Sequence, residues 1–516
     1  MLPRARERQS RTNTSNSLHA AQTVLILETH CMTRRITTIF QLTSRTLAVL
    51  AGTVILFGGG VSGCTSLDPK PDIDRAASTV MQRSGFAAAW DQLWADHFEA
   101  WDGVSPLTAE QAVVISLKNN REIRAQVEQI SVGRADLVQA GLLPNPVLLL
   151  WNSFPYDPVS GGSIIGVQAF QNFTAMWLRP SKIRAADARL NATVLDVSDK
   201  ALRLVADVRS SHERIAFGQR SVKITEESIT DANGLAEKVE GQRRAGISTQ
   251  IAVNRVRQQI KTLDEDLRSQ QRELAKERRR LLELMGFATA AADWTAALPA
   301  KEDEALNEPA PPEQITEDMV ISLATTQRLD VAAAHAIVEA NAANLTTEEL
   351  NRLKDLGLGV DYERNPQGNQ AMGPLLAVPI PIFDDNRAQI AKAGSLARVA
   401  LANYEAVVQR AVREARVAFI GMMLARSQAD NFRHDTLGGT EDLQQRLRFN
   451  VRNAGAAFQA GEISLIDWLD IVRERQSALQ TLNELRLEAS RSRIELEYAV
   501  GGALFISNNI GNNPGM

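Results

Sequence analysis

The stretch RRAGIST at residues 243–249 returns further along the chain as FQAGEIS at residues 458–464. Two other stretches recur in the same order: VISL at 114–117 returns at 320–323, and LLELMG at 281–286 returns as LEYAVGG at 496–502. The three offsets lie between 206 and about 215 positions. A sequence that matches itself at a nearly constant offset indicates a duplicated structural unit. We therefore expect two equivalent halves.

Long segments without helix breakers surround these repeats. Gly and Pro, which cost a helix interior about 1 and 3 kcal/mol, are absent between Pro180 and Gly218, from Ile247 to Met285 and from Glu462 to Val500. Within the first segment, apolar residues alternate by four and three positions, as on one face of a helix: Leu190, Val194, Val197, Ala201, Leu204 and Val208. One helix over 181–240 would be about 90 Å long, which is too long for a compact domain.

Each half also contains a predicted pair of strands. The first pair is PVLLLWNSF at 146–154 and SIIGVQAFQNF at 163–173. The second pair begins at Leu356–Glu363, where apolar residues alternate with polar or small ones, and ends with LLAVPIPIF at 375–383. Each strand is near the length that crosses a bilayer obliquely. Four such strands cannot close a barrel alone without leaving unpaired backbone groups in hydrocarbon, so several chains must share one barrel.

These patterns predict a mainly α fold with a small transmembrane β part, internally duplicated, with long helical hairpins and four strands per chain. The expected segments are an over-extended start and signal peptide (1–63), an anchored N-terminal segment (64–106), a first repeat (107–290), a Pro-rich linker (291–314), a second repeat (315–505) and a flexible tail (506–516). Met32 opens a more usual signal than Met1 does.

Cys64 is predicted to carry a lipid. The apolar run Leu47–Phe57 follows several Arg residues and precedes small residues, which is the layout of a secretory signal, and it is too short to span a membrane as a helix. The sequence Val61-Ser62-Gly63-Cys64 resembles the lipobox of bacterial lipoproteins, which implies cleavage before Cys64 and a covalent lipid on its thiol and amine (diacylglycerol and an N-acyl chain such as palmitate). The alternative is an ordinary packed Cys.

Composition argues against several other classes of protein. The chain has a net charge of −4, and residues 1–63 hold seven Arg and two Glu, so the remainder is more acidic and nucleic acid is not an expected partner. The His residues beyond the signal are too scattered for metal-ligand spacing, and neither CxxC nor HExxH occurs. We therefore expect no metal site, no cofactor apart from the lipid, and no enzyme.

The order of helix, strand pair and long helical hairpin, present twice behind a lipobox, resembles the bacterial outer-membrane efflux channel family (TolC-like), and within it the acylated members. The resemblance covers roughly 107–502, and its most typical stretches are LTAEQAVVISLKNN (107–120), VPIPIFDDNRAQI (378–390) and AGEISLIDWLDIVRERQ (460–476). It implies a homotrimer that forms a shared β-barrel in outer-membrane lipid and an α-helical tunnel in the periplasm. It further implies an exit duct that works with a periplasmic adaptor and an inner-membrane transporter.

The resemblance also implies roles for residues at the two hairpin tips. Asp467 and Asp470, six and nine positions after Gly461, would form acidic rings at a periplasmic gate, and the adaptor would contact Ala245, Gly246, Ile247, Ala460, Gly461 and Ile463. The first repeat has Ala252 at the position that corresponds to Asp467. Ile463 stands where some relatives have an Arg that links the gate, so that link should be missing. The alternative for the two Asp residues is a solvated helix face.

Two other functions remain open from the sequence. A periplasmic adaptor lipoprotein also has a lipid anchor and a long hairpin, but it carries one hairpin rather than two with their own membrane-length strands. The third possibility is an all-helical scaffold without a barrel.

Overall fold

The computed structural model describes residues 66–90, 101–154, 162–287, 294–297, 315–352, 354–434 and 443–502. The chain divides into two units, Met1–Thr65 and Ser66–Met516, and all described residues belong to the second. Cys64 and the predicted signal segment lie outside the described residues.

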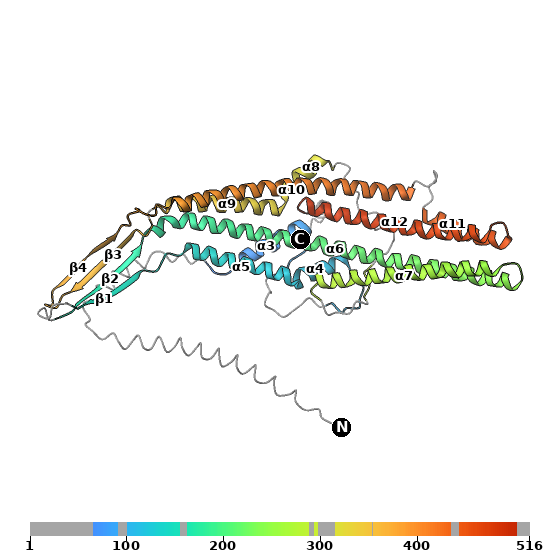
Figure 1. Cartoon of the computed structure of the whole chain (residues 1–516), viewed down its shortest axis with the longest axis horizontal. Coiled ribbons are helices and arrows are strands. Elements are labelled where there is room, and N and C mark those ends of the chain that lie inside the picture. The colour runs from blue at the N-terminus through green and yellow to red at the C-terminus, as the bar shows by residue number, and fades with distance from the viewer. Residues whose placement is uncertain are drawn as a thin grey trace, which may run out of the picture. The chain divides into compact units, whose positions relative to one another are not determined.

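The elements of the two halves follow the same order (Figure 1). After α3 (Lys70–Ser84), the first half consists of α4 (Ala109–Asn119), α5 (Arg121–Gly141), β1 (Val147–Ser153), β2 (Ile164–Asn172), α6 (Thr174–Arg244) and α7 (Gln250–Leu284). The second half consists of α8 (Glu317–Gln327), α9 (Leu329–Leu350), β3 (Gly357–Arg364), β4 (Gln370–Ala377), α10 (Arg387–His434), α11 (Leu443–Ala460) and α12 (Leu465–Ala499). The predicted mainly α, duplicated fold with four strands is confirmed.

Helix α6 has 71 residues, which makes it about 105 Å long. The helix predicted over 181–240 is confirmed, but α6 begins earlier, at Thr174, and contains Pro180. Tertiary contacts hold the turns before Pro180: the backbone N–H of Leu356 donates to Thr174 Oγ1 at 2.8 Å, and Leu178 is buried. These contacts offset the hydrogen bond that a Pro inside a helix cannot donate.

The duplication extends to matching contacts at the ends of the helices. In the first half, Asn120 caps α5 and its Nδ2 donates to the backbone oxygen of Leu284, the last residue of α7, at 2.9 Å. In the second half, Arg328 is the N-cap residue of α9 and its Nη1 donates to the backbone oxygen of Ala499, the last residue of α12, at 3.4 Å. The same junction is thus built with an amide in one half and a guanidinium in the other.

The four strands form one antiparallel sheet in the order β1-β2-β3-β4. The first three strands lie where the sequence predicts them, whereas the prediction for the fourth is wrong: β4 covers Gln370–Ala377 rather than 375–383. Pro379 and Pro381 have no N–H to donate to a ladder. The apolar residues that alternate with them after Ala377 therefore do not belong to a paired strand. Pro374 is accommodated within β4, opposite Val360, because β4 is an edge strand.

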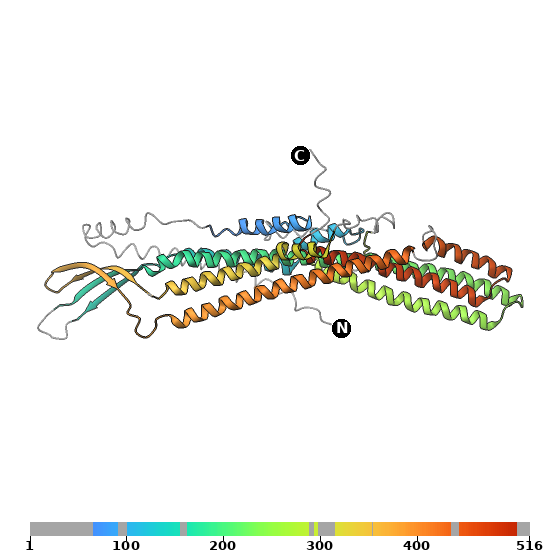
Figure 2. The ribbon, with the colours of Figure 1, turned by 90° about the horizontal axis from the view of Figure 1, so that it is seen from above.

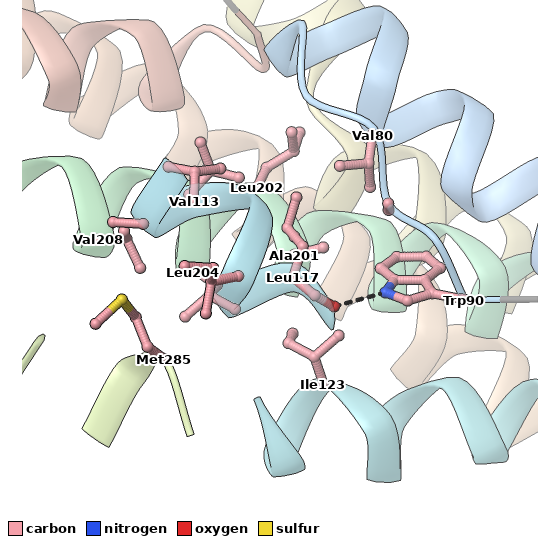
Figure 3. Close-up of a cluster of buried hydrophobic side chains, with 14 of the residues drawn as sticks. Val80, Trp90, Val113, Leu117, Ile123, Ala201, Leu202, Leu204, Val208 and Met285 are labelled. Carbon is pink, nitrogen blue, oxygen red and sulfur yellow. Dashed lines mark hydrogen bonds between the residues drawn. The ribbon is translucent and has the colours of Figure 1, made fainter. Parts of the chain in front are cut away.

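The largest cluster of buried apolar side chains joins the first-half helices to α3. Figure 3 shows Val80 of α3, Leu117 of α4, Ile123 of α5 and Val208 of α6 around it, and the indole N–H of Trp90 donates to the backbone oxygen of Leu117 at 3.0 Å. Within this unit the sheet lies at one end of the long helices and the two hairpin turns lie at the other (Figure 2). Of the helices in the described ranges, none is sufficiently long and apolar to cross a bilayer.

A buried polar cluster joins α6, α9, α10 and α12. Arg328, with a side chain 5% exposed, pairs with Asp330 at 2.8 Å and with Glu414 at 2.9 Å. The hydroxyl of Tyr498 donates to Asp199 Oδ2 at 3.3 Å. Burial, followed by the nearby charge of Asp330, raises the pKa of Asp199 to about 6.

We expect Asp199→Asn to raise the melting temperature at pH 7.5 and to leave it nearly unchanged near pH 4. A carboxyl whose pKa is higher in the folded state binds more protons when folded between the two pKa values, so it lowers stability as the pH rises from about 4 to about 6. Asn stays neutral and can still accept the Tyr498 hydrogen bond. Thermal unfolding of both proteins at the two pH values tests this, and a difference in melting temperature that is the same at both would contradict it.

Candidate functional site

The turns of the two hairpins have the same backbone structure. Gly246 and Gly461 adopt φ of 75° and 77°. The next residue in each turn donates its N–H five residues back, from Ile247 to the oxygen of Gln242 and from Glu462 to the oxygen of Ala457, both at 2.8 Å. This is a Schellman-type helix end, which requires the left-handed conformation that Gly adopts without strain. The repeated Ala-Gly pair of the sequence therefore marks the two turns.

Each turn is followed by a capped helix, but the two caps differ. Thr249 caps α7 through a bond from Ala252 N, whereas Ser464 and Asp467 form a reciprocal capping box at the start of α12. The Asp467 carboxylate accepts from the Ser464 hydroxyl at 2.7 Å and from the Ser464 N–H at 3.0 Å. These two bonds, the hydroxyl first, hold the pKa of Asp467 below its ordinary value. Asp467 therefore remains ionised at neutral pH.

Asp470 lies one turn further along α12 and is also exposed. Its Oδ1 pairs with Arg473 Nη1 at 3.2 Å, and Arg473 Nε donates to Gln259 Oε1 of α7 at 2.8 Å. Part of the acidic charge predicted at the tip is thus balanced by an Arg. The two Asp residues lie on exposed surface of the same helix near its start, and their gate role stays a prediction.

The residues predicted to contact an adaptor lie in these turns. Ile247 is 77% exposed, and Ala245, Gly246, Ala460 and Gly461 are exposed as well. Ile463 is only partly exposed, because it packs against the apolar cluster that joins the two hairpins. That cluster consists of Leu235, Val239, Val253, Val256, Ala454, Trp468, Leu469 and Val472.

An ion pair that the sequence did not predict also joins the hairpins near the tip. Arg475 of α12, with a side chain 13% exposed, lies 2.5 Å from Asp231 and 3.3 Å from Glu227, both in α6. Its partners are more than 240 residues away in sequence, so no local pattern could have identified the pair. The contact fixes the second hairpin against the first within one chain.

The two faces of the sheet differ in character. Residues opposite each other in a ladder point to the same face, and the register defines one face that is mainly apolar. Its apolar residues are Leu148, Leu150, Ile165, Val167, Ala169, Leu358, Val360, Tyr362, Met372, Pro374 and Leu376, and its polar residues, which lie near the strand ends, are Asn152, Gln171, Arg364 and Gln370. Leu150, Met372 and Leu376 on this face are 71%, 69% and 64% exposed. An exposed apolar surface of this kind marks a membrane or protein contact.

The opposite, mixed face carries aliphatic residues as well as polar, small and aromatic ones: Val147, Leu149, Trp151, Gln168, Phe170, Gly359, Asp361, Glu363, Gly373 and Leu375. Trp151 lies over Gly166, where an added Cβ would come within 2.1 Å of the indole. Apolar residues toward lipid and polar residues toward a lumen, in alternation, are the pattern of an outer-membrane barrel strand.

Comparisons with known proteins agree with this arrangement. No family model matches the chain. The cation efflux system protein CusC of Escherichia coli strain K12 is 26% identical over 473 residues, which cover 86% of this chain and 97% of CusC. A crystal structure of CusC matches with a TM-score of 0.63 at 20% identity and covers 80% of this chain and 97% of that one. The outer-membrane channel OprN matches with a TM-score of 0.61 at 18% identity, over 83% and 96% of the two chains.

The outer membrane protein VceC of Vibrio cholerae has the same fold, with a TM-score of 0.61 at 15% identity over 77% of this chain and 96% of that one. The proteins matched by fold include named channels, so the adaptor alternative has no support. The sequence match spans both repeats of the chain, and the fold repeats the same hairpins and strands. The chain is thus similar in sequence to the efflux protein CusC over most of its length, and it has the fold of the outer-membrane channels CusC and OprN.

Proposed function

We propose that three copies of this chain form the exit duct of a tripartite efflux or type I secretion system. The observation that carries the proposal is a four-stranded sheet with an exposed apolar face and, among the described strands, a free edge at both β1 and β4. In hydrocarbon these edges would leave N–H and C=O groups unpaired. Pairing β4 of each copy with β1 of the next satisfies them and closes a shared barrel.

The helical body supports the rest of the proposed path. With the sheet in the outer membrane, the long helices extend into the periplasm as a tunnel, and the exposed turns at 245–247 and 460–463 become the surface that an adaptor contacts. The adaptor would couple the duct to an inner-membrane transporter. In this role the chain is a passive conduit that needs no catalytic residue and no cofactor.

The lipid on Cys64 is a further part of the proposal. Asp68, four residues after Cys64, accepts a bond through its backbone oxygen from Arg134 Nε of α5 at 3.4 Å. Arg134 also pairs with Asp72 at 3.3 Å. These contacts hold the start of the described chain against α5, the helix that leads directly into β1. They support an anchor that acts beside the proposed membrane region.

Single-channel recording of the purified whole chain in planar bilayers tests the function. We expect discrete conductance steps from a trimeric preparation, because a shared barrel and tunnel enclose a continuous aqueous path. Cross-linking with size-exclusion chromatography would establish the number of copies. A trimer that inserts and conducts nothing would contradict the duct.

For the gate, we expect Asp467→Asn combined with Asp470→Asn to reduce cation selectivity, most strongly at low salt, where charges are less screened. Asn at 467 removes the charge but keeps an acceptor for the capping box. CusC is by name a cation efflux protein, which makes cation preference the property to measure, as a reversal potential in a salt gradient. Glu462→Gln removes one negative charge from the turn outside α12 and serves as the control for each of the two single Asn variants. An unchanged reversal potential in the double variant would reject the gate role.

A further inference from the structure

A groove of about 920 Å³ runs between α5 and the first turns of α6. Its α6 wall is one face of that helix, because its residues are spaced by three or four positions: Ala175, Arg179, Lys182, Ala186, Arg189 and Thr193. Asp136 of α5 is the acidic residue that lines it, and Leu142 and Leu143 line the end nearest the strands. The groove is therefore basic along its α6 wall and apolar where it approaches the sheet.

The basic residues of the groove have no partner of opposite charge within the described part of the chain. No ion pair forms there at Arg179, Lys182 or Arg189. The next three Arg residues after Arg189 on α6 do form ion pairs. Arg203 pairs with Glu495 at 3.2 Å, Arg209 with Glu497 at 2.5 Å and Arg214 with Glu277 at 3.6 Å. The groove thus presents cationic groups that form no ion pair with any residue in the described ranges, although Asp136 lines the same groove.

Arg179 is held in place for such a ligand. Its Nε donates to the backbone oxygen of Gly141, the last residue of α5, at 2.7 Å. This bond uses one donor of the guanidinium and fixes its plane at the groove, while the forked Nη groups are the donors suited to a phosphate.

The upper part of the groove lies at the depth of lipid headgroups if the sheet spans the membrane. Strand β2 ends at Asn172 and α6 begins at Thr174, so Arg179 and Lys182 lie about 8 and 12 Å below the start of the helix. A headgroup layer is about 5–8 Å thick, so Arg179 lies at its lower edge, and the long side chain of Lys182 reaches it because side chains of a helix point back toward its N-terminus. Trp177, which is 40% exposed, lies in the same turns, and exposed Trp is typical of a membrane interface.

We propose that Arg179 and Lys182 bind the phosphate of an anionic phospholipid headgroup from the periplasmic leaflet of the outer membrane. Leu142, which is 57% exposed, contacts the glycerol and the first carbons of the acyl chains. Arg189 lies about 23 Å below the start of α6 and is too deep to reach the headgroup. This inference rests on the proposed function, because it requires the sheet to lie in the membrane.

The test is binding of phosphatidylglycerol to the delipidated whole chain in detergent, measured by native mass spectrometry, with phosphatidylcholine as the neutral lipid. We expect phosphatidylglycerol to be retained in preference, and Arg179→Gln with Lys182→Gln to weaken its binding about tenfold or more, since two charge-assisted contacts are lost. Arg184→Gln is the control for each single variant, because Arg184 is an exposed residue of α6, about 15 Å below its start, that does not line the groove. Arg189→Gln is a second control, because Arg189 lines the groove but lies too far below the start of α6 to reach the headgroup, so this variant should bind phosphatidylglycerol as the wild type does.

Several results would overturn the site. An equal loss of binding in Arg184→Gln would show general attraction to negative charge, and equal retention of phosphatidylcholine would remove the requirement for an anionic headgroup. Displacement of the lipid by inorganic phosphate at low concentration would show that the groove takes a free anion. Conductance of the same preparations separates the two proposals: a conducting wild type that binds no phosphatidylglycerol defeats the lipid site alone, and a conducting double variant shows that its fold is intact.

Discussion

Leu150→Arg is expected to prevent insertion of the chain into the outer membrane. Leu150 is the central residue of β1, lies on the apolar face of the sheet and is 71% exposed. An Arg on the lipid side of a barrel strand costs about 2–4 kcal/mol at the middle of the bilayer, and a trimer carries this cost in each of its copies. Heat-resistant trimers in outer-membrane fractions, detected by unheated gel electrophoresis, should fall to a small fraction of the wild-type amount.

The control for this variant lies on the other face of the same sheet. Gln168 is the central residue of β2 and lies on the mixed face, opposite Leu149 in the ladder. In a barrel whose lumen is lined by that face, Gln168→Arg meets water rather than lipid, so the trimer should insert normally and change only in conductance and ion preference. If Gln168→Arg blocked insertion and Leu150→Arg did not, the assignment of the two faces would be reversed.

Most of the fold could be predicted from the sequence because its signals are local or periodic. The absence of Gly and Pro marked α7, α12 and residues 181–217 of α6. The repeated Ala-Gly pair marked both turns, since each turn requires a left-handed residue at Gly246 and Gly461. The fourth strand was misplaced because its apolar alternation continues past the paired residues to Val378 and Ile380, which are 54% and 77% exposed. An alternation of apolar residues indicates which face of an extended segment is apolar. Whether the segment pairs with a neighbouring strand depends on backbone N–H donors, which Pro lacks.

The candidate site was less accessible to sequence reasoning. Asp467 could be located by its distance from Gly461, but its place in a capping box and the pairing of Asp470 with Arg473, which balances part of the acidic charge of the tip, could not. The ion pair of Arg475 with α6 and the basic groove on α6 depend on helices brought together by the fold. A helix face with basic residues is usually solvated, and the groove beside α5 together with the bond from Arg179 to Gly141 distinguishes this one.

Arg328→Met is expected to lower the free energy of unfolding by about 3–5 kcal/mol, as when one member of a buried ion pair is removed. The side chain of Arg328 is 5% exposed and stands between Asp330 and Glu414, with the carboxyl of Asp199 acting on the same cluster. Met fills a similar volume but leaves these carboxylates without their cation. Because Glu414 is 36% exposed and can be partly hydrated, the loss should lie near the lower end of the range. Chemical unfolding of the purified chain measures it.

The duplication supplies the matched control for this prediction. Asn120 occupies the corresponding junction of the first half, where it makes the equivalent bond to the end of α7, but it is neutral. Asn120→Ala removes a helix cap and a hydrogen bond and should cost only about 1–2 kcal/mol. A larger loss in Arg328→Met than in Asn120→Ala is the result expected if the carboxylates left without a cation dominate the cost. Adding Glu414→Gln to Arg328→Met should restore part of the lost stability, because it removes one uncompensated carboxylate, and a double variant no more stable than Arg328→Met would show that packing rather than charge holds α9 to α10 at this junction.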